Sequence, residues 1–232
     1  MQISSDRILT THTGSLPRPD DLLELLVARD QSEPYDQSAF DERLKAAVDA
    51  IVQKQITAGI DIVNDGEMSK IGYGAYVKER LTGYDGEEAP RIHASDLDEF
   101  PVYFRRLYGP EGFDKMTRPL CTGPIEYVDR AAVMTDLENL KTASQGSEVS
   151  DRFLNSATPG LVSLWLGNAY YKSHEEYVWA IAHAMKQEYE AIVEAGFILQ
   201  FDSPDLGMGR HMQFASLELN EFRKNIELHI EA

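Results

Sequence analysis

Two segments of this chain follow the same order: an amphipathic helix, a glycine, a short apolar run and then carboxylates. Residues 59–67 read Gly-Ile-Asp-Ile-Val-Asn-Asp-Gly-Glu, and residues 196–205 read Gly-Phe-Ile-Leu-Gln-Phe-Asp-Ser-Pro-Asp. A helix that ends at glycine and leads into a strand is typical of α/β proteins. In (β/α) barrels, ligands bind at the carboxyl ends of the strands. The two acidic strand ends therefore predict a site for a cationic group, a metal or a proton.

The rest of the chain continues this alternation. We expect strands over residues 8–12, 60–64, 118–122, 152–157 and 197–201. We expect helices over residues 20–27, 38–58, 129–143, 174–195 and 217–232, with shorter ones after Ser69 and around residues 100–107. These elements make five βα units, whereas a closed barrel needs eight in about 250 residues. The predicted fold class is α/β: a (β/α) barrel with about five of its eight units. It forms one domain over residues 1–232, with an excursion at about 83–116.

Composition narrows the range of partners. Asp and Glu number 39 against 22 Lys and Arg, a formal net charge of −17, which repels nucleic-acid phosphates and anionic membrane surfaces. No apolar stretch approaches the roughly 18 residues that span a bilayer. Cys121 is the single cysteine, so no internal disulfide can form, which fits a reducing cytoplasm. The N-terminus carries Ser4, Ser5 and Asp6 before any apolar run, so we expect no secretory signal.

The segment that leaves the first predicted strand contains His12, Gly14 and Ser15. A glycine followed by a hydroxyl residue can present backbone N–H groups and an O–H to a carboxylate or phosphate. An ordinary turn, in which Ser15 bonds its own backbone, is the alternative. His12 by itself is more typical of a hydrogen-bonded structural histidine than of a ligand.

Among the acidic residues, Glu67 and Asp202 are the candidates for a site. Gly66 permits a sharp turn that aims Glu67 over the barrel mouth. Asp202 ends an apolar run, and a carboxylate there needs a cation, either a substrate ammonium or an internal base such as Arg210. Cys121 is a candidate thiolate, with a small buried hydrophobe as the alternative. The chain has no His-x-Cys, Cys-x-x-Cys or His-x-x-x-His pair suited to zinc.

Four segments, taken in order and spacing, resemble one family: Thr10 to Arg18, Asn64 to Glu67, Leu120 to Pro124 and Ala195 to Asp202. The sequence is similar to the catalytic domain of cobalamin-independent methionine synthase, and closer to its single-domain type II relatives. The resemblance implies a catalytic (β/α) barrel of the methionine synthase and uroporphyrinogen decarboxylase type. It also implies a zinc-dependent transfer of a methyl or alkyl group to a thiol, like that of 5-methyltetrahydropteroyltriglutamate–homocysteine S-methyltransferase.

The resemblance assigns roles to individual residues. It places the amino and carboxyl groups of homocysteine against Gly14, Ser15, Glu67 and Asp202. It places the zinc ligands beyond Ala232, so the metal would bind none of this chain's residues, and the chain resembles the homocysteine-binding half of a longer protein. A methylfolate is the implied methyl donor. Met208 stands where the family has an acidic folate contact, so a different donor stays open.

Three alternatives follow from the same residues. One is an epoxide-opening thiol alkyltransferase of the same superfamily. Another is a non-catalytic barrel that binds an amino acid without a metal. A porphyrinogen decarboxylase fits less well, because its substrates need cationic pockets. An incomplete barrel leaves strand edges exposed, which predicts a homo-oligomer.

Overall fold

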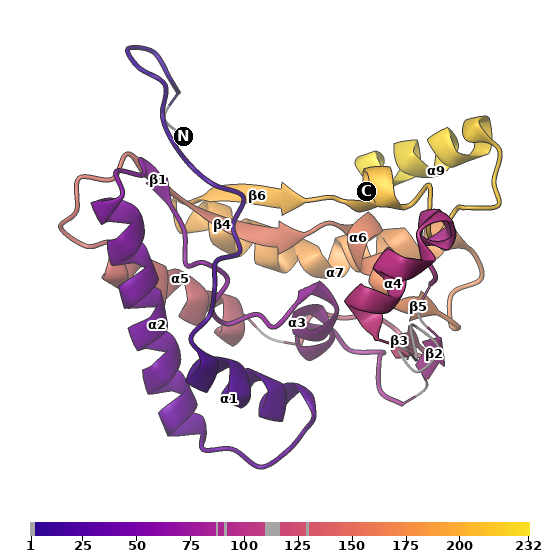
Figure 1. The fold of residues 1–232 in the computed structure, drawn as a ribbon, viewed down its shortest axis with the longest axis horizontal. Helices are drawn as coiled ribbons and strands as arrows, with labels where there is room; N and C mark the ends of the chain where they lie inside the picture. The colour runs from indigo at the N-terminus through magenta and orange to yellow at the C-terminus, as the bar shows by residue number, and fades with distance from the viewer. Residues whose placement is uncertain (1–2, 87, 91, 110–116, 129) are drawn as a thin grey trace. The chain divides into compact units, whose positions relative to one another are not determined.

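The computed structural model describes residues 3–86, 88–90, 92–109, 117–128 and 130–232, and its fold is α/β (Figure 1). The helices are α1 (Asp20–Asp30), α2 (Gln37–Thr57), α3 (Tyr73–Arg80), α4 (Pro101–Tyr108), α5 (Ala131–Ala143), α6 (Pro159–Trp165), α7 (His174–Glu194), α8 (Asp205–Met208) and α9 (Leu219–Glu231), with a 3-10 helix η1 (Ser95–Glu99). The strands are β1 (Ile62–Val63), β2 (Glu88–Pro90), β3 (Thr117–Cys121), β4 (Asp151–Ala157), β5 (Gly167–Asn168) and β6 (Ile198–Asp202).

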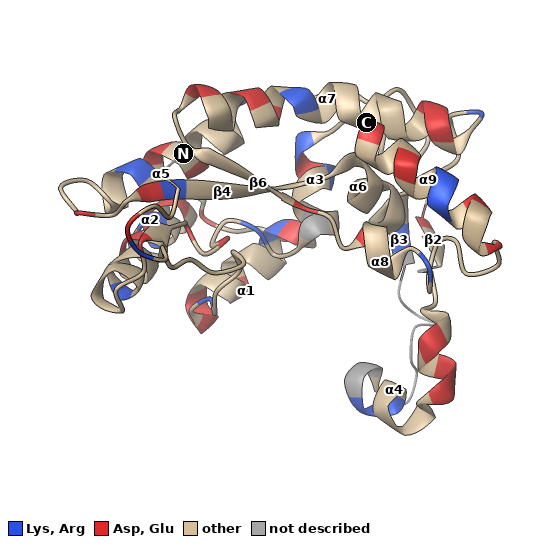
Figure 2. Ribbon diagram, turned by 90° about the horizontal axis from the view of Figure 1, so that it is seen from above, with Lys and Arg blue, Asp and Glu red and all other residues tan. Residues whose placement is uncertain are grey.

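The chain divides into two units. Unit 1 comprises Met1–Tyr76, Asp129–Ser156 and Gln187–Phe201, and unit 2 comprises Val77–Val128, Ala157–Lys186 and Asp202–Ala232. Asp and Glu residues are spread over helices of both units (Figure 2). In the part of the chain that the structure describes, no helix combines the length and the apolar character that crossing a bilayer requires.

Unit 1 is built on a sheet with the strand order β1-β4-β6. β1 and β4 are parallel, with Ile62 opposite Asp151. Helices α1, α2 and α5 pack on this part of the chain through their apolar stripes (Figure 1). The buried residues include Leu26, Leu44 and Leu137. This core holds the end of β1, where the first acidic segment begins.

Helix α2 shows why the sequence predicted its helices well. The carboxylate of Asp36 accepts hydrogen bonds from the backbone of Ser38 and Ala39, which caps the first turn. Gly59, with φ of 79°, follows the last turn, as expected for a helix that ends at glycine. The C-terminal glycine of α7, Gly196, has the same left-handed conformation, with φ of 80°.

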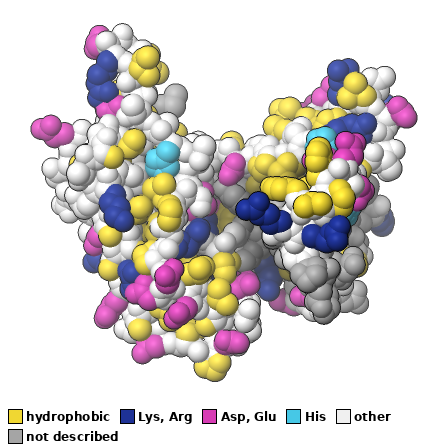
Figure 3. Space-filling view, in the orientation of Figure 1, with side chains coloured by type: hydrophobic (Ala, Val, Ile, Leu, Met, Phe, Trp, Pro, Cys, Tyr) yellow, Lys and Arg dark blue, Asp and Glu magenta, His cyan; other side chains and the backbone are white. Residues whose placement is uncertain are grey.

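Unit 2 contains the second sheet, with the strand order β2-β3-β5. β2 is antiparallel to β3, and β5 is parallel to it. The hydroxyls of Tyr84 and Tyr177 are 2.9 Å apart in its interior. Hydrophobic side chains also lie on the surface (Figure 3), and those of α4 include Val102 and Tyr103, which are 76% and 56% exposed.

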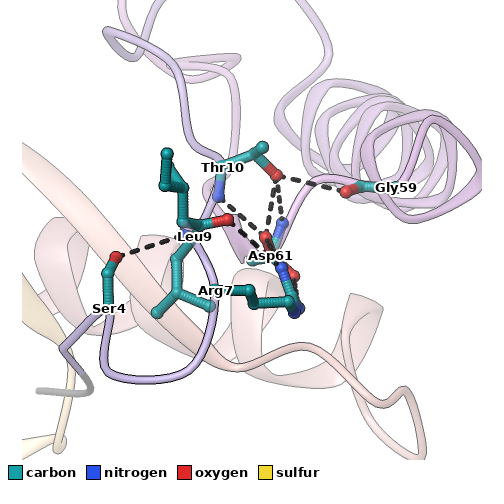
Figure 4. A network of polar contacts seen from close by, with 7 residues as sticks. Ser4, Arg7, Leu9, Thr10, Gly59 and Asp61 are labelled. Atoms are coloured by element: carbon teal, nitrogen blue, oxygen red, sulfur yellow. Dashed lines mark hydrogen bonds and ion pairs between the residues drawn. The ribbon is translucent and has the colours of Figure 1, made fainter.

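Several predicted elements differ in the structure. The first predicted strand, residues 8–12, is not a strand. The reason is that the N–H of Thr10 donates to the carboxylate of Asp61 rather than to a neighbouring strand (Figure 4). The short elements α6, α8 and β5 were not predicted. Asp129, the predicted start of a helix, and residues 110–116 of the predicted excursion lie outside the described residues. The described strands form two three-stranded sheets, so the incomplete (β/α) barrel with about five of its eight units remains an expectation.

Candidate functional site

The turn after β1 holds two consecutive residues in the left-handed region. Gly66 has φ of 68° and Glu67 has φ of 57°. The side chain of Asn64 accepts from the N–H of Gly66, and that of Asp65 accepts from the N–H of Glu67, both at 2.9 Å. Left-handed backbone at a residue other than glycine costs roughly 1–2 kcal/mol. Such strain is concentrated at functional sites, and Glu67 is only 6% exposed.

The Gly14–Ser15 turn lies against this segment. The N–H of Leu16 donates to the carbonyl of Gly66 at 3.1 Å. Gly14 has φ of 134°, and a Cβ atom there would lie 2.5 Å from Nδ2 of Asn155. Only glycine therefore fits at this position. Ser15, next to it, is exposed.

His12 fixes the conformation of the same turn. Its Nε2 lies 2.9 Å from Oε1 of Gln55, and its Nδ1 accepts from the N–H of Gly14 at 3.2 Å. His12 therefore carries its proton on Nε2 and is a hydrogen-bonded structural histidine here. The N–H of Gly14 is already used within the protein, so Gly14 contributes its conformation and leaves Ser15 as the donor facing outward.

Two cations that the sequence reading missed lie beside this turn. The guanidinium of Arg18 donates to the carbonyl of Glu67 at 2.8 and 3.2 Å. Burial lowers the pKa of Arg18, and the nearby carboxylates of Glu67 and Asp65 oppose that effect. The ammonium of Lys70 is buried, and it donates to the carbonyl of Asn155 at 2.6 Å. Arg18 stands inside the motif that begins at residue 10, so its position in that motif was the available signal.

Asp65 differs from the other carboxylates of the site in its raised pKa. Burial is the main cause that raises its pKa to about 6, and the neighbouring Asp136 adds to it, whereas Lys70 acts in the opposite direction. Asp65 can therefore hold a proton close to neutral pH.

The remaining candidates, Asp202 and Cys121, belong to unit 2. Asp202 is half-buried at the end of β6, and its carbonyl accepts from the backbone N–H of Thr158 at 3.4 Å. Cys121 is fully buried, and its Sγ donates to the carbonyl of Gly123 at 3.2 Å. Burial raises the pKa of the Cys121 thiol, so this residue has the properties of a small buried side chain.

The described residues do not fit a zinc ion. Zinc sites in proteins use three or four His, Cys, Asp or Glu ligands. Among the residues that the structure describes, no three such side chains are arranged to hold a metal. Of the predicted site residues, the structure brings Gly14, Ser15 and Glu67 together in unit 1, with His12 beside them.

Known proteins with sequences similar to this chain include methionine synthases. No protein-family model matches the chain. It is 25% identical to a methionine synthase of Sulfolobus acidocaldarius and 26% identical to one of Sulfurisphaera tokodaii, each over 95% of this chain. A methionine synthase of Saccharolobus solfataricus is 29% identical over 85% of it. The chain resembles methionine synthases. It spans only 59%, 59% and 53% of the length of these three relatives.

Solved structures support the same fold. A B12-independent methionine synthase from Shewanella sp. W3-18-1, in complex with selenomethionine, matches 85% of this chain and 52% of its own, with a TM-score of 0.61 and 23% identity. A candidate vitamin-B12-independent methionine synthase from Listeria monocytogenes matches 97% of this chain and 63% of its own, with a TM-score of 0.61 and 19% identity. The family resemblance predicted from the four sequence segments is confirmed, and so is the α/β fold class.

Proposed function

We propose that this chain binds homocysteine, or a similar amino-acid thiol, as part of an enzyme that transfers a methyl group to the thiol. Similarity to methionine synthases over most of the chain supports the reaction class. The observation that carries the proposal is the placement of the Gly14–Ser15 turn against the left-handed turn of Gly66 and Glu67. We also infer that the chain is part of a (β/α) barrel, as the resemblance implies.

In this proposal, the two turns hold the two charged ends of the amino acid. The backbone N–H and the hydroxyl of Ser15 donate to the substrate carboxylate. The carboxylate of Glu67 accepts from the substrate ammonium, and the resemblance gives Asp202 the same partner. Arg18 holds the carbonyl of Glu67, which fixes the turn that presents the Glu67 carboxylate. Hydrogen bonds to charged groups are about twice as strong as neutral ones.

The resemblance also implies a zinc ion that activates the thiol. Because the described residues do not fit this metal, we assign to them only the binding and orientation of the amino-acid end of the substrate. The methyl donor in this proposal is a methylfolate or another methylated compound.

Titration calorimetry with L-homocysteine tests the proposal. Ser15→Ala, Glu67→Gln and Asp202→Asn should each weaken binding at least about tenfold, the change that accompanies a loss of roughly 1.4 kcal/mol. Glu42→Gln, an exposed position on α2, is the matched control and should bind like the wild type. No binding of homocysteine by the folded chain would overturn the proposal.

A second ligand separates the alternatives. A thiol that lacks the amino group should bind much more weakly than homocysteine, because Glu67 and Asp202 lose their partner. Equal binding of the two thiols would favour the epoxide-opening alkyltransferase instead. L-Methionine is a useful third probe, because the Shewanella relative was solved in complex with selenomethionine.

A further inference from the structure

Unit 2 contains a chain of hydrogen-bonded polar side chains, buried at Asp205 and His229 and half-buried at His174, that takes no part in the proposed substrate contacts. Nδ1 of His229 lies 2.9 Å from Oδ2 of Asp205, and each side chain is 1% exposed. Nε2 of His229 lies 2.8 Å from Nε2 of His174. These residues come from three helices that are distant in the sequence: α8, α9 and the first residue of α7.

The geometry assigns the protons. An ionised Asp205 only accepts, so Nδ1 of His229 carries a hydrogen. Nε2 of a neutral His229 is then an acceptor, and Nε2 of His174 is the donor that faces it. Both rings cannot be doubly protonated at once, because two N–H groups would then face each other. With His229 neutral, the chain of hydrogen bonds has one direction, from His174 through His229 to Asp205.

The other carboxylate oxygen of Asp205 connects this chain to β6. Oγ1 of Thr158 lies 3.2 Å from Oδ1 of Asp205 and 3.3 Å from the carbonyl oxygen of Asp202. The backbone N–H of Thr158 also donates to that carbonyl. Thr158 is the N-cap of α6, where its hydroxyl accepts from the N–H of Leu161. One hydroxyl thus lies between the buried acid and the backbone of Asp202.

The residues packed around Asp205, His229 and His174 leave little room for these side chains to adopt other positions. A side chain at Gly160 would collide with both Asp205 and His229. The ring of Phe214 packs edge-on against His174, with ring centroids 5.4 Å apart, and in a tilted arrangement against His229, with centroids 5.7 Å apart. A buried carboxylate that is held by two donors in a closely packed environment is costly to disturb.

We propose that Asp205, His229 and His174 are positioning residues that fix the backbone at Asp202 through Thr158. This inference rests on the proposed function, in which Asp202 binds the substrate ammonium. The end of β6 is followed at once by a turn, Ser203-Pro204, and by the four-residue helix α8. A short helix of this kind is weakly stable alone, so the buried contact to α9 supplies the anchor that holds the strand end.

Two substitutions at one position test the proposal on the full chain. His229→Asn keeps a donor near the place of Nδ1 and so keeps the bond to Asp205. His229→Gln places its amide near Nε2, keeps contact with His174 and loses the bond to Asp205. Homocysteine affinity, measured by calorimetry on folded protein, should fall about tenfold or more in His229→Gln and in Asp205→Asn and stay within about threefold of wild type in His229→Asn. A merely structural role would instead change stability and leave the affinity of the folded fraction alone.

The outcomes separate this inference from the proposed function. If wild-type protein binds homocysteine and all three variants bind equally well, the positioning role is overturned and the proposed function stands. If wild-type protein does not bind, the proposed function fails. The ¹⁵N shifts of the imidazole nitrogens then decide whether the chain of hydrogen bonds exists, and they also serve if a variant does not fold. A hydrogen on Nδ1 of His229 and on Nε2 of His174 supports it, and any other tautomer overturns it.

Discussion

Asn64 and Asn155 are joined side chain to side chain inside unit 1. Nδ2 of Asn64 donates to Oδ1 of Asn155 at 3.2 Å, and both residues are completely buried. Nδ2 of Asn64 also lies 3.2 Å from the carbonyl oxygen of Gly14, and Nδ2 of Asn155 lies 3.0 Å from that of Thr13. The pair thus ties the Thr13–Gly14 turn to the end of β1 and to β4 at once, so the turn depends on both strands.

Asn155→Ala should lower the free energy of unfolding by about 1–3 kcal/mol, because the buried amide of Asn64 loses a partner. The carbonyl of Thr13 keeps the side chain of Gln200 as a donor at 2.7 Å, which limits the loss. Urea unfolding measures the effect. Asn139→Ala, a half-buried position on α5, should change stability by no more than about 0.5 kcal/mol. Equal effects at the two positions would contradict the role of the pair.

Gly66 and Gly59 form a matched pair of left-handed glycines, with φ of 68° and 79°. A Cβ at Gly66 would lie 2.8 Å from Cε of Met68 and 3.3 Å from Ile51, whereas a Cβ at Gly59 would meet nothing within 4 Å. Gly59→Ala should therefore lower unfolding free energy by about 1–2 kcal/mol, the cost of the conformation alone. Gly66→Ala should add a steric cost of about 1–3 kcal/mol. Thermal unfolding of both variants checks the order, and a smaller loss at Gly66 would contradict it.

The sequence predicted the parts of the fold that have a strong local pattern. Helices α2 and α7 follow from apolar spacing and a terminal glycine, and β4 and β6 follow from apolar runs. Helix α6 was not predicted, although Thr158 and Pro159 begin it. A threonine followed by proline is the signature of a helix N-cap and first turn, so that signal was present.

The site was harder to predict because its contacts connect distant segments. Gly14 and Glu67 were identified from strand-end positions, but nothing near Asn155 indicates that its amide reaches Thr13, 142 residues away. The same limit applies to residues 8–12, where Asp61 takes the backbone N–H of Thr10. Whether a side chain or a neighbouring strand accepts a backbone N–H depends on the folded chain, and a local sequence pattern does not show it.

Asp61 should hold the N-terminal segment in place (Figure 4). Its carboxylate pairs with the guanidinium of Arg7 and accepts from the N–H and the hydroxyl of Thr10 at 2.7 and 2.9 Å. These contacts, that of Arg7 first, hold the pKa of Asp61 well below its usual range. Asp61→Ala should therefore speed tryptic cleavage after Arg7. Asp21→Ala, which removes the exposed pair with Arg43, is the control and should leave that cleavage rate unchanged.

The loss of stability of unit 2 at acid pH should depend on His174. Burial, together with the nearby His229, lowers the pKa of His174 from 6.5 to about 4. Between these values the unfolded chain binds more protons than the folded one, so stability falls as the pH drops through this range. His174→Gln can still donate to His229 but does not titrate, so its unfolding free energy should change less from about pH 7 to about pH 4. His183→Gln, exposed on the same helix, should keep the wild-type slope.

Asp65→Asn should stabilise the protein at neutral and alkaline pH. Burial, and then Asp136, raises the pKa of Asp65 from 3.8 to about 6. Between these values the folded protein binds the extra proton, so the contribution of Asp65 to stability falls as the pH rises and stays low above about pH 6. Asparagine avoids the buried charge and still accepts from the N–H of Glu67.

The expected gain of Asp65→Asn in unfolding free energy at about pH 8 is of the order of 1–3 kcal/mol. Because wild-type Asp65 is itself neutral in the folded protein near pH 4, the two proteins should become similar there. Asp41→Asn, at an exposed position on α2, controls for the loss of one negative charge from an acidic protein. A variant that is less stable than wild type at about pH 8 would show that the ionised carboxylate is needed for the turn, and that its burial is compensated by Lys70.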